Sequence, residues 1–576
     1  MKAKRREIRT EDKKPVRVAR PRRIWPWALS FFLAAFLVFE VYGPVLRGPF
    51  LFDDDYLAFR RPGFTDQLGA WMAGVRPLLM FTYWVNFRLS PVDTFLYHVV
   101  NVVFHLGAGV LMFFILRRLL ELAGTRGDRV WILSAFGAGL FLLHPIQTES
   151  VAYVASRSEN LSVMLMLGAF AAFVCRPVAA ISWGRAAAVL VLFGAALASK
   201  EHTLMLPALL LLTDYYWNPG FSLQGIRRNW RLYLPLAAAA AVGVAFVMRV
   251  LAHADTAGFG MKNLKWYEYF FTQGRALFVY LRLFVLPYGQ TVDYDFPISR
   301  TPWQHGAFLG LAALVAITVA AWLYRRRWPL ASFGWLTFLI LMAPTSSVMP
   351  IADPVAERRL YISMIGLLLI AFEFLRRLNV DRKMLAGALA GVLVVAAVLT
   401  WQRNQVWTDN MALWRDAVEK FPGKSRAHFQ LAYAYYSQNR CAEALPHYRR
   451  VAEIDGPAYD SLVDWALALD CNNQPQEALA KLKQAAALDS TAHVYSLIGM
   501  VFAKQSRWAE ALAALDTASR INPAYAMTFV YRGDVRLSLN DPAAAIAEYR
   551  RALELDPRNE IVGQKLIQAE QRARVR

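Results

Sequence analysis

The sequence predicts an all-α protein in two parts: a polytopic membrane domain of about eleven transmembrane helices, followed by a solenoid of helical repeats. Hydrophobic residues occupy 57% of the 576 positions, and apolar runs long enough to approach or span a bilayer recur up to about residue 400. Beyond Asp409 the pattern becomes amphipathic, charged and periodic. We therefore expect a basic cytoplasmic N-terminus at 1–23, a membrane domain at 24–402 and a repeat domain at 403–576.

The net charge of +21 divides at the same boundary. From Asp409 to Arg576 there are 21 Lys and Arg against 20 Asp and Glu, so almost all of the positive excess lies in the first part. There the basic residues fall between apolar runs, which is typical of topology signals. A nucleic-acid-binding protein would carry a basic stripe on its soluble part, so nucleic acid is not expected as a partner.

The first expected element is a membrane anchor at 24–42. Eleven basic and three acidic residues precede it, and no small-residue cleavage site follows, which indicates a retained signal-anchor that starts in the cytoplasm. Placing the later basic clusters in the cytoplasm gives further crossings near 97–116, 130–144, 160–175, 186–199, 203–217, 232–251, 303–324, 331–343, 360–375 and 384–401. A full span at 266–287 would reverse this order, so we expect a pair of short interfacial or re-entrant helices there.

An odd number of crossings places the repeat domain and the residues after the first helix on the same, non-cytoplasmic side. The short, Ala- and Arg-rich chain favours a bacterial inner membrane over an endoplasmic reticulum. The other outward segments would be 144–160, 199–203, 252–302 and 344–360, and catalytic residues should lie there.

The repeat domain has the tetratricopeptide period. Ala444, Ala478, Ala511 and Ala545 are separated by 34, 33 and 34 residues, and a small residue stands twelve positions before each of them. Small residues at this spacing let two antiparallel helices pack closely. We expect about four repeats after a degenerate half-repeat, with a concave groove for a protein or peptide acceptor. A structural cap or an oligomer contact is the alternative.

Three cysteines imply no disulfide framework. Cys441 and Cys471 fall near the helix–helix turns of adjacent repeats and would lie in an oxidising space, so both a bridge and two free thiols stay open.

The acidic triplet Asp53, Asp54 and Asp55 lies close to the end of the first membrane helix. Carboxylates are costly at a bilayer edge, and an anchor helix does not need them. A reaction that removes a proton from a hydroxyl group does need a carboxylate. A merely solvated acidic loop is the competing interpretation.

Several segments together resemble one family, the transmembrane and tetratricopeptide-repeat O-mannosyltransferases of the GT-C glycosyltransferase superfamily. The segments are Phe52–Asp55, Arg76–Leu78, Tyr97–Asn101 with His105, His144–Val151 with Arg157, Lys200–Glu201 and Glu357–Tyr361. The resemblance implies a GT-C-like membrane domain that transfers a sugar, with inversion, from a polyprenyl phosphate to a hydroxyl of a protein, usually on Ser or Thr, on the outer face of the membrane.

The resemblance does not say which acid of the triplet is catalytic, but the chemistry and position of the residues suggest individual roles. Asp54 is favoured as general base, with Asp53 next. Arg358, Arg359 and Arg157 would clamp the leaving phosphate, while Glu149 and His144 would hold sugar hydroxyls or orient the base. The full binding set is Asp55, Arg76, His98, Asn101, His144, Glu149, Arg157, Lys200, Glu201, Glu357, Arg358 and Arg359.

Each of these residues has a structural alternative. His98, Asn101 and His105 share one helix face and could pack against neighbouring helices or bind a divalent metal, although no resident metal or cofactor is expected. Arg358–Arg359 could be an interfacial anchor, His144–Pro145 a helix end, and Lys200–Glu201 a local ion pair. No Gly-rich phosphate loop is found in the sequence, which fits a lipid-linked donor.

Two other functions stay open. The chain could be a membrane-anchored tetratricopeptide scaffold for envelope assembly without chemistry. It could also be a ligase or polymerase that moves lipid-diphosphate oligosaccharides.

Overall fold

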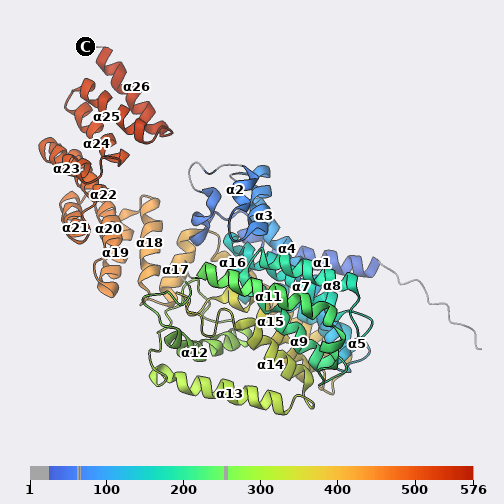
Figure 1. Ribbon diagram of the computed structural model, residues 1–576. Coiled ribbons are helices and arrows are strands. Elements are labelled where there is room, and N and C mark those ends of the chain that lie inside the picture. Colours follow the sequence, from blue (N-terminus) through green and yellow to red (C-terminus); the bar gives the residue numbers. More distant parts are fainter. Residues whose placement is uncertain (1–24, 61–63, 65–66, 92, 252–256, 575–576) are drawn as a thin grey trace, which may run out of the picture.

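The computed structural model describes residues 25–60, 64, 67–91, 93–251 and 257–574. The basic N-terminus expected at 1–23 lies outside this range. The described residues form helices joined by loops and contain no β-strand, which confirms the all-α prediction. Figure 1 shows a helical body built from the first sixteen α-helices, from which the C-terminal helices extend as an arm.

The body contains sixteen α-helices. They are α1 (Trp25–Val41), α2 (Leu68–Met72), α3 (Pro77–Leu89), α4 (Phe95–Leu122), α5 (Asp128–Leu143), α6 (Thr148–Ala152), α7 (Arg157–Val174), α8 (Trp183–Leu197), α9 (Leu206–Trp217), α10 (Gln224–Arg228), α11 (Trp230–Leu251), α12 (Trp266–Val285), α13 (Ala307–Leu323), α14 (Pro329–Met342), α15 (Leu360–Leu375) and α16 (Arg382–Gln405). Short 3₁₀ turns precede several of them, including η2 (Phe52–Tyr56), η5 (Val154–Ser156), η6 (Glu201–Met205) and η8 (Glu357–Arg359).

Three of the described helices are long and apolar enough to cross a membrane: Phe95–Leu122, Gln304–Leu323 and Arg382–Gln405. The bent pair Asp128–Leu143 and Pro145–Ala152 would add a fourth span if it acts as one. Other apolar helices are shorter, such as Trp183–Leu197 and Pro329–Met342. A helix therefore lies near each predicted crossing, while the count of about eleven crossings stays a prediction.

The segment after residue 265 differs from the expectation of two short helices, because α12 is one continuous helix of 20 residues. No proline interrupts it. Its single glycine, Gly274, allows α12 to pack closely against α13. A Cβ placed on Gly310 of α13 would lie 2.3 Å from the Gly274 carbonyl oxygen of α12, so the two backbones touch there.

The arm consists of paired antiparallel helices. They are α17 (Asn410–Lys420), α18 (Ser425–Ser437), α19 (Cys441–Asp455), α20 (Tyr459–Cys471), α21 (Pro475–Leu488), α22 (Ala492–Lys504), α23 (Trp508–Ile521), α24 (Ala526–Ser538), α25 (Pro542–Leu555) and α26 (Glu560–Arg574). Within four pairs the turn contains a residue with positive φ, at Asn439, Asn473, Ser506 and Asn540. The small residues that define the period are buried between the paired helices, as the pattern predicts.

The first repeat is continuous with the body. Ala444 and Tyr448 of α19 belong to the same apolar core as the membrane half, whereas Leu462 and Val463 of α20 belong to a separate core. A disulfide joins Cys441 to Cys471, with their Cα atoms 6.0 Å apart, so the bridge left open by the sequence is present in the structure.

Candidate functional site

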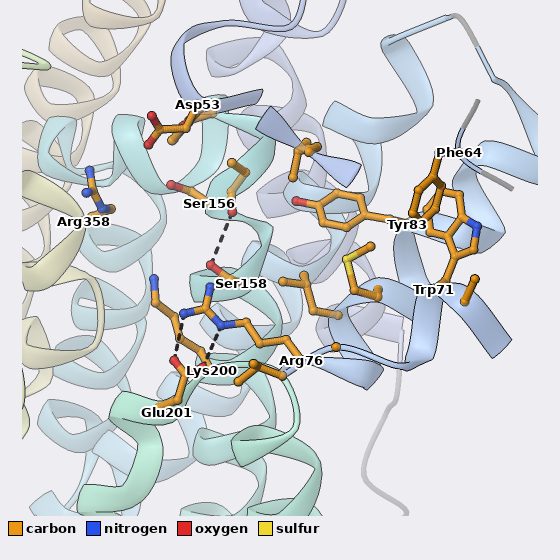
Figure 2. Close-up of a pocket in the computed structure, with 18 residues that line it drawn as sticks. Asp53, Phe64, Trp71, Arg76, Tyr83, Ser156, Ser158, Lys200, Glu201 and Arg358 are labelled. Carbon is orange, nitrogen blue, oxygen red and sulfur yellow. Dashed lines mark hydrogen bonds and ion pairs between the residues drawn. The ribbon is translucent and has the colours of Figure 1, made fainter. Parts of the chain in front are cut away.

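A cavity of about 680 Å³ lies between η2, α2, α3, the start of α7 and the loop before α9 (Figure 2). One part of its wall is polar and contains Asp53, Arg76, Ser156, Ser158, Lys200, Glu201 and Arg358. The other part is apolar and aromatic and contains Leu57, Phe64, Trp71, Leu79, Met80 and Tyr83. Five of the residues predicted for the site thus meet in one space, although they come from four separate segments.

Asp53 and Asp54 of η2 have different environments. Asp54 is 1% exposed, and its two carboxylate oxygens accept hydrogen bonds from the backbone N–H groups of Leu51 (3.0 Å) and Ala155 (2.6 Å). Asp53 is exposed and lines the cavity. The Asp55 side chain lies outside the described part of the structure. The ranking expected from the sequence therefore changes: Asp54 holds two backbone segments together, and Asp53 faces the cavity.

Two ion pairs form the polar wall below Asp53. Arg76 donates two hydrogen bonds to the Glu201 carboxylate, at 2.9 and 2.8 Å. Lys200 donates to Glu159 of α7 at 2.5 Å. The two segments are also joined by their backbones, because Leu78 N–H donates to the Ala198 carbonyl at 3.2 Å. Lys200–Glu201 is therefore not one local ion pair, because each residue binds a partner distant in sequence.

Arg358 provides the remaining cation of the cavity. Its backbone N–H donates to Glu149 of α6 at 3.0 Å, and its guanidinium pairs with the same carboxylate. The Glu149 side chain is 3% exposed and the Arg358 side chain is 25% exposed. The carboxylate of this pair is therefore buried, while the guanidinium stays accessible from the cavity. Glu149 thus positions Arg358 and does not itself line the cavity.

The two neighbours of Arg358 face other parts of the protein. Glu357 accepts hydrogen bonds from Gln290 Nε2 (2.6 Å), Thr291 N–H (2.8 Å) and Tyr294 Oη (2.8 Å). Burial raises the pKa of the Glu357 carboxyl to about 7, against the opposing effect of the Arg403 guanidinium. Arg359 donates to the Tyr269 hydroxyl at 3.1 Å and is not among the residues that line the cavity.

Arg157 does not reach the cavity either. It is 0% exposed, and its guanidinium donates to Asn101 Oδ1 (3.0 Å), Asn86 Oδ1 (2.5 Å) and the Tyr97 carbonyl (2.9 Å). Such a fully engaged guanidinium holds α3, α4 and α7 together and has no place in a phosphate clamp.

The predicted histidines also have structural partners. His98 Nε2 contacts the Gly48 carbonyl at 3.2 Å, and His105 contacts the Tyr361 hydroxyl at 2.8 Å. His144 accepts from Ile146 N–H at 3.1 Å and contacts the Phe284 carbonyl at 3.0 Å, so it joins a helix end to α12. Among the described residues no group of three or more His, Cys, Asp or Glu side chains is placed to hold a metal ion.

The sequence reasoning did not single out Tyr153, Ser156 or Glu159. Tyr153 and Ser156 line the cavity, and Glu159 holds Lys200. The sequence does contain a pattern that points to these residues. Polar residues cluster from Gln147 to Asn160, between two apolar segments.

The repeat domain docks beside the acidic turn. The Phe52 ring lies 5.4 Å from the Trp414 ring of α17. Arg426 of α18 donates to Asp293 at 2.7 and 2.6 Å and to Asp353 at 2.8 Å. The half-repeat helix α17 therefore contacts the turn that carries Asp53, and the first repeat contacts the loop that leads to Arg358.

Comparisons with known proteins find a family match for the repeat half and relatives for most of the chain. A family model for the tetratricopeptide repeat matches residues 412–459, 463–526 and 497–560. Protein O-mannosyl-transferase TMTC3 of Mus musculus is 22% identical over 565 residues, which cover 84% of this chain and 57% of that protein. Tmtc3 of Drosophila melanogaster is 24% identical over 565 residues, with 81% and 59% covered. Human TMTC1 is 32% identical over 151 residues, with 23% and 16% covered. The chain spans less than two thirds of the length of these relatives.

Proposed function

Because the chain is a relative of the protein O-mannosyl-transferases over most of its length, we propose that it is a membrane glycosyltransferase of GT-C type. It transfers a sugar, mannose in the first instance, from a polyprenyl phosphate to a Ser or Thr hydroxyl of a protein. The tetratricopeptide domain holds the acceptor polypeptide.

The observation that carries the proposal is the joint placement of Asp53, Lys200 and Arg358 on the wall of one cavity. The acceptor oxygen attacks the anomeric carbon of the sugar while Asp53 takes the hydroxyl proton. The bond from that carbon to the phosphate oxygen breaks, and the lipid phosphate leaves as an anion beside Arg358 and Lys200. A single displacement of this kind inverts the anomeric configuration.

The chemistry of the cavity suits a lipid-linked donor. Guanidinium and ammonium groups bind a phosphate, and the apolar wall around Trp71 and Leu79 accommodates hydrocarbon. The proposed reaction needs no resident cofactor.

The Cys441–Cys471 disulfide supports an extracytoplasmic repeat domain, since disulfides persist in oxidising compartments. The docking of α17 and α18 onto the cavity loops supports an active site on that same side. We propose the periplasmic face of a bacterial inner membrane as the location, from the composition of the chain.

The test is the rate at which the purified 576-residue chain, in lipid, transfers mannose from polyprenyl-phosphate mannose to envelope proteins of a deletion strain. Asp53→Asn should lower kcat by about 100-fold or more, because general-base catalysis contributes 10²–10⁴, and it should leave the KM for the donor unchanged. Transfer by Asp53→Asn at the parent rate would refute the proposed mechanism. A protein that acts only on lipid-diphosphate oligosaccharides would be a ligase or polymerase instead, and one that acts on neither donor would be a scaffold.

A further inference from the structure

Two buried hydroxyl groups in the cavity lack a hydrogen bond of normal geometry to any of the described residues. Tyr153 is 3% exposed and Ser156 is 2% exposed, and both residues line the cavity. Ser156 Oγ has no hydrogen-bond partner among the described residues. Tyr153 Oη also lacks a hydrogen bond of normal geometry to them, although the Asp53 carboxylate lies close enough to raise the pKa of the phenol. Leaving a buried hydroxyl unsatisfied costs about 1–3 kcal/mol, so such groups are uncommon in folded proteins. Two of them on one cavity wall indicate that a polar ligand completes them.

The backbone that carries these hydroxyls is fixed on three sides. Asn101 Nδ2 donates to the Tyr153 carbonyl at 3.1 Å, and the Tyr83 hydroxyl donates to the Val154 carbonyl at 2.7 Å. Ala155 N–H donates to Asp54 Oδ1 at 2.6 Å. The backbone polar groups of this turn are thus engaged. Its two hydroxyls face the cavity, Tyr153 Oη beside the Asp53 carboxylate and Ser156 Oγ without a partner among the described residues. A site that is rigid before the ligand arrives binds with a smaller loss of entropy.

The two hydroxyls lie near the residues that the proposed reaction uses, Asp53 as base and Arg358 as phosphate ligand. Figure 2 shows Ser156 between Asp53 and Ser158 on the polar wall. Burial raises the pKa of the Tyr153 phenol, the Asp54 and Asp53 carboxylates raise it further and Arg358 opposes them, so the phenol lies near both the proposed base and the proposed phosphate ligand. The sugar ring must lie between the attacking hydroxyl at Asp53 and the leaving phosphate at Arg358.

We infer that Tyr153 and Ser156 bind hydroxyl groups of the transferred sugar and thereby orient its anomeric carbon, an inference that rests on the proposed glycosyl transfer. A phenol and an alcohol each offer one donor and acceptor lone pairs, which complement the hydroxyls of a sugar. A neutral pair of this kind distinguishes the sugar from the phosphate, which the cations bind. Tyr153 and Ser156 are therefore the residues of the cavity that select among sugars.

The experiment compares polyprenyl-phosphate mannose with donors in which one mannose hydroxyl is removed. Tyr153→Phe and Ser156→Ala should each lower kcat/KM on the intact donor by roughly tenfold, the value of about one hydrogen bond. The parent should show the same loss on the deoxy donor that lacks the matching hydroxyl. On that donor the variant should lose nothing further, because the contact is already absent.

Two matched controls separate binding from packing. Tyr97→Phe removes another buried phenol hydroxyl without a partner, and Ser162→Ala removes a buried hydroxyl that donates to the Glu159 carbonyl. Neither residue lines the cavity. Both controls should keep the ranking of the deoxy donors shown by the parent. Variants at 153 and 156 that lose the same factor on every donor would overturn the inference, even if Asp53→Asn abolishes transfer.

A binding measurement keeps the inference testable if transfer itself is not observed. The parent should bind polyprenyl-phosphate mannose roughly tenfold more tightly than polyprenyl phosphate, and the double variant Tyr153→Phe, Ser156→Ala should bind both equally. Equal affinity of the parent for the two lipids would overturn the sugar subsite. Failure of the proposed function appears separately, as unchanged transfer by Asp53→Asn or as no transfer by the parent.

Discussion

At the residue scale, hydrogen bonding separates two adjacent carboxylates, Asp53 and Asp54, whose roles the residue type alone does not distinguish. Asp54 accepts from Leu51 N–H, three residues away, and from Ala155 N–H, 101 residues away. The second bond depends on how η5 packs against η2, which no local pattern encodes. Asp53 is then left to face the cavity. The division of roles follows from a tertiary contact and not from the residue type.

This division predicts different defects for two neighbouring substitutions. Asp54→Asn replaces one acceptor oxygen by an NH₂ group that faces a backbone N–H, so the free energy of unfolding should fall by about 1–3 kcal/mol. Asp53→Asn should lose transfer activity with no change in thermal midpoint. Thermal unfolding of both proteins in the same detergent measures this, and an equal loss of stability in the two would contradict the assignment.

Glu357 predicts a pH dependence of stability. Its pKa is 4.5 in an ordinary environment and about 7 in the folded protein, mainly because it is buried, while Arg403 lowers and Glu149 raises it. Between these values the folded state keeps a proton that the unfolded state releases. This stabilising contribution is complete below about pH 4.5 and is lost as the pH rises through 7.

Glu357→Gln should therefore flatten the fall of the thermal midpoint between pH 5 and pH 8. Glu443→Gln, at an exposed carboxylate paired with Arg440, should keep the slope of the parent. A Glu357→Gln protein with the parent slope would show that another group titrates in this range.

At the element scale, the repeats contain a regular backbone feature besides their small residues. The positive-φ residues Asn439, Asn473, Ser506 and Asn540 are spaced by 34, 33 and 34 positions, the same intervals as the buried alanines. Asn tolerates the left-handed region better than other non-glycine residues, since its short side chain bonds locally. Three of the four turns use Asn, and Ser506 is the exception.

Ser506→Asn should stabilise the repeat domain by up to about 1 kcal/mol, because it relieves the left-handed strain at this turn. Ser506→Val should destabilise it, since a β-branched residue is least compatible with positive φ. Denaturant midpoints of the two variants and the parent measure the order, and an equal midpoint for Asn and Val would contradict it.

The elements were largely predictable from the sequence, and the site only in part. Hydropathy and the 34-residue period depend on local composition, so helices such as α4 and α16 lie where the apolar runs are. The structural roles of Arg157 and His144 could not be seen in the sequence, because their partners, Asn101 and the Phe284 carbonyl, belong to segments distant in sequence. Without those partners, both residues are interpreted as ligand-binding residues. The motif predicts Arg358 as a site residue, and the structure places it on the cavity wall. The role of Glu149 in holding it depends on the fold and is not visible in the motif.

At the scale of the whole molecule, the repeat domain and the cavity loops form one charged interface. Arg426 bridges Asp293, which is 2% exposed, and Asp353, while Lys424 approaches Asp293 at 3.5 Å. Lys420 also donates to the Gln290 carbonyl at 2.6 Å. The loop of Asp353 leads directly to Glu357 and Arg358. We therefore expect a change in the position of the first repeat to shift Arg358, the proposed phosphate ligand.

Arg426→Ala should loosen this interface, because it leaves Asp293 buried with a weaker partner. We expect faster hydrogen exchange in α17, α18 and residues 290–295 and 353–359, together with a lower rate of transfer. Arg450→Ala removes an exposed pair with Glu453 in the same domain and should change neither. Unchanged exchange in Arg426→Ala would show that apolar packing alone seats the domain.

The Cys441–Cys471 bond crosses the boundary between the core shared with the membrane half and the core of the outer repeats. It thereby restrains α20, the first helix of the next repeat, against α19, which packs with the membrane half. If the outer repeats hold the acceptor, as proposed above, the modified residue should lie at a nearly constant number of residues from the bound segment. Reduction of the disulfide should broaden the distribution of modified positions without abolishing the proposed sugar transfer.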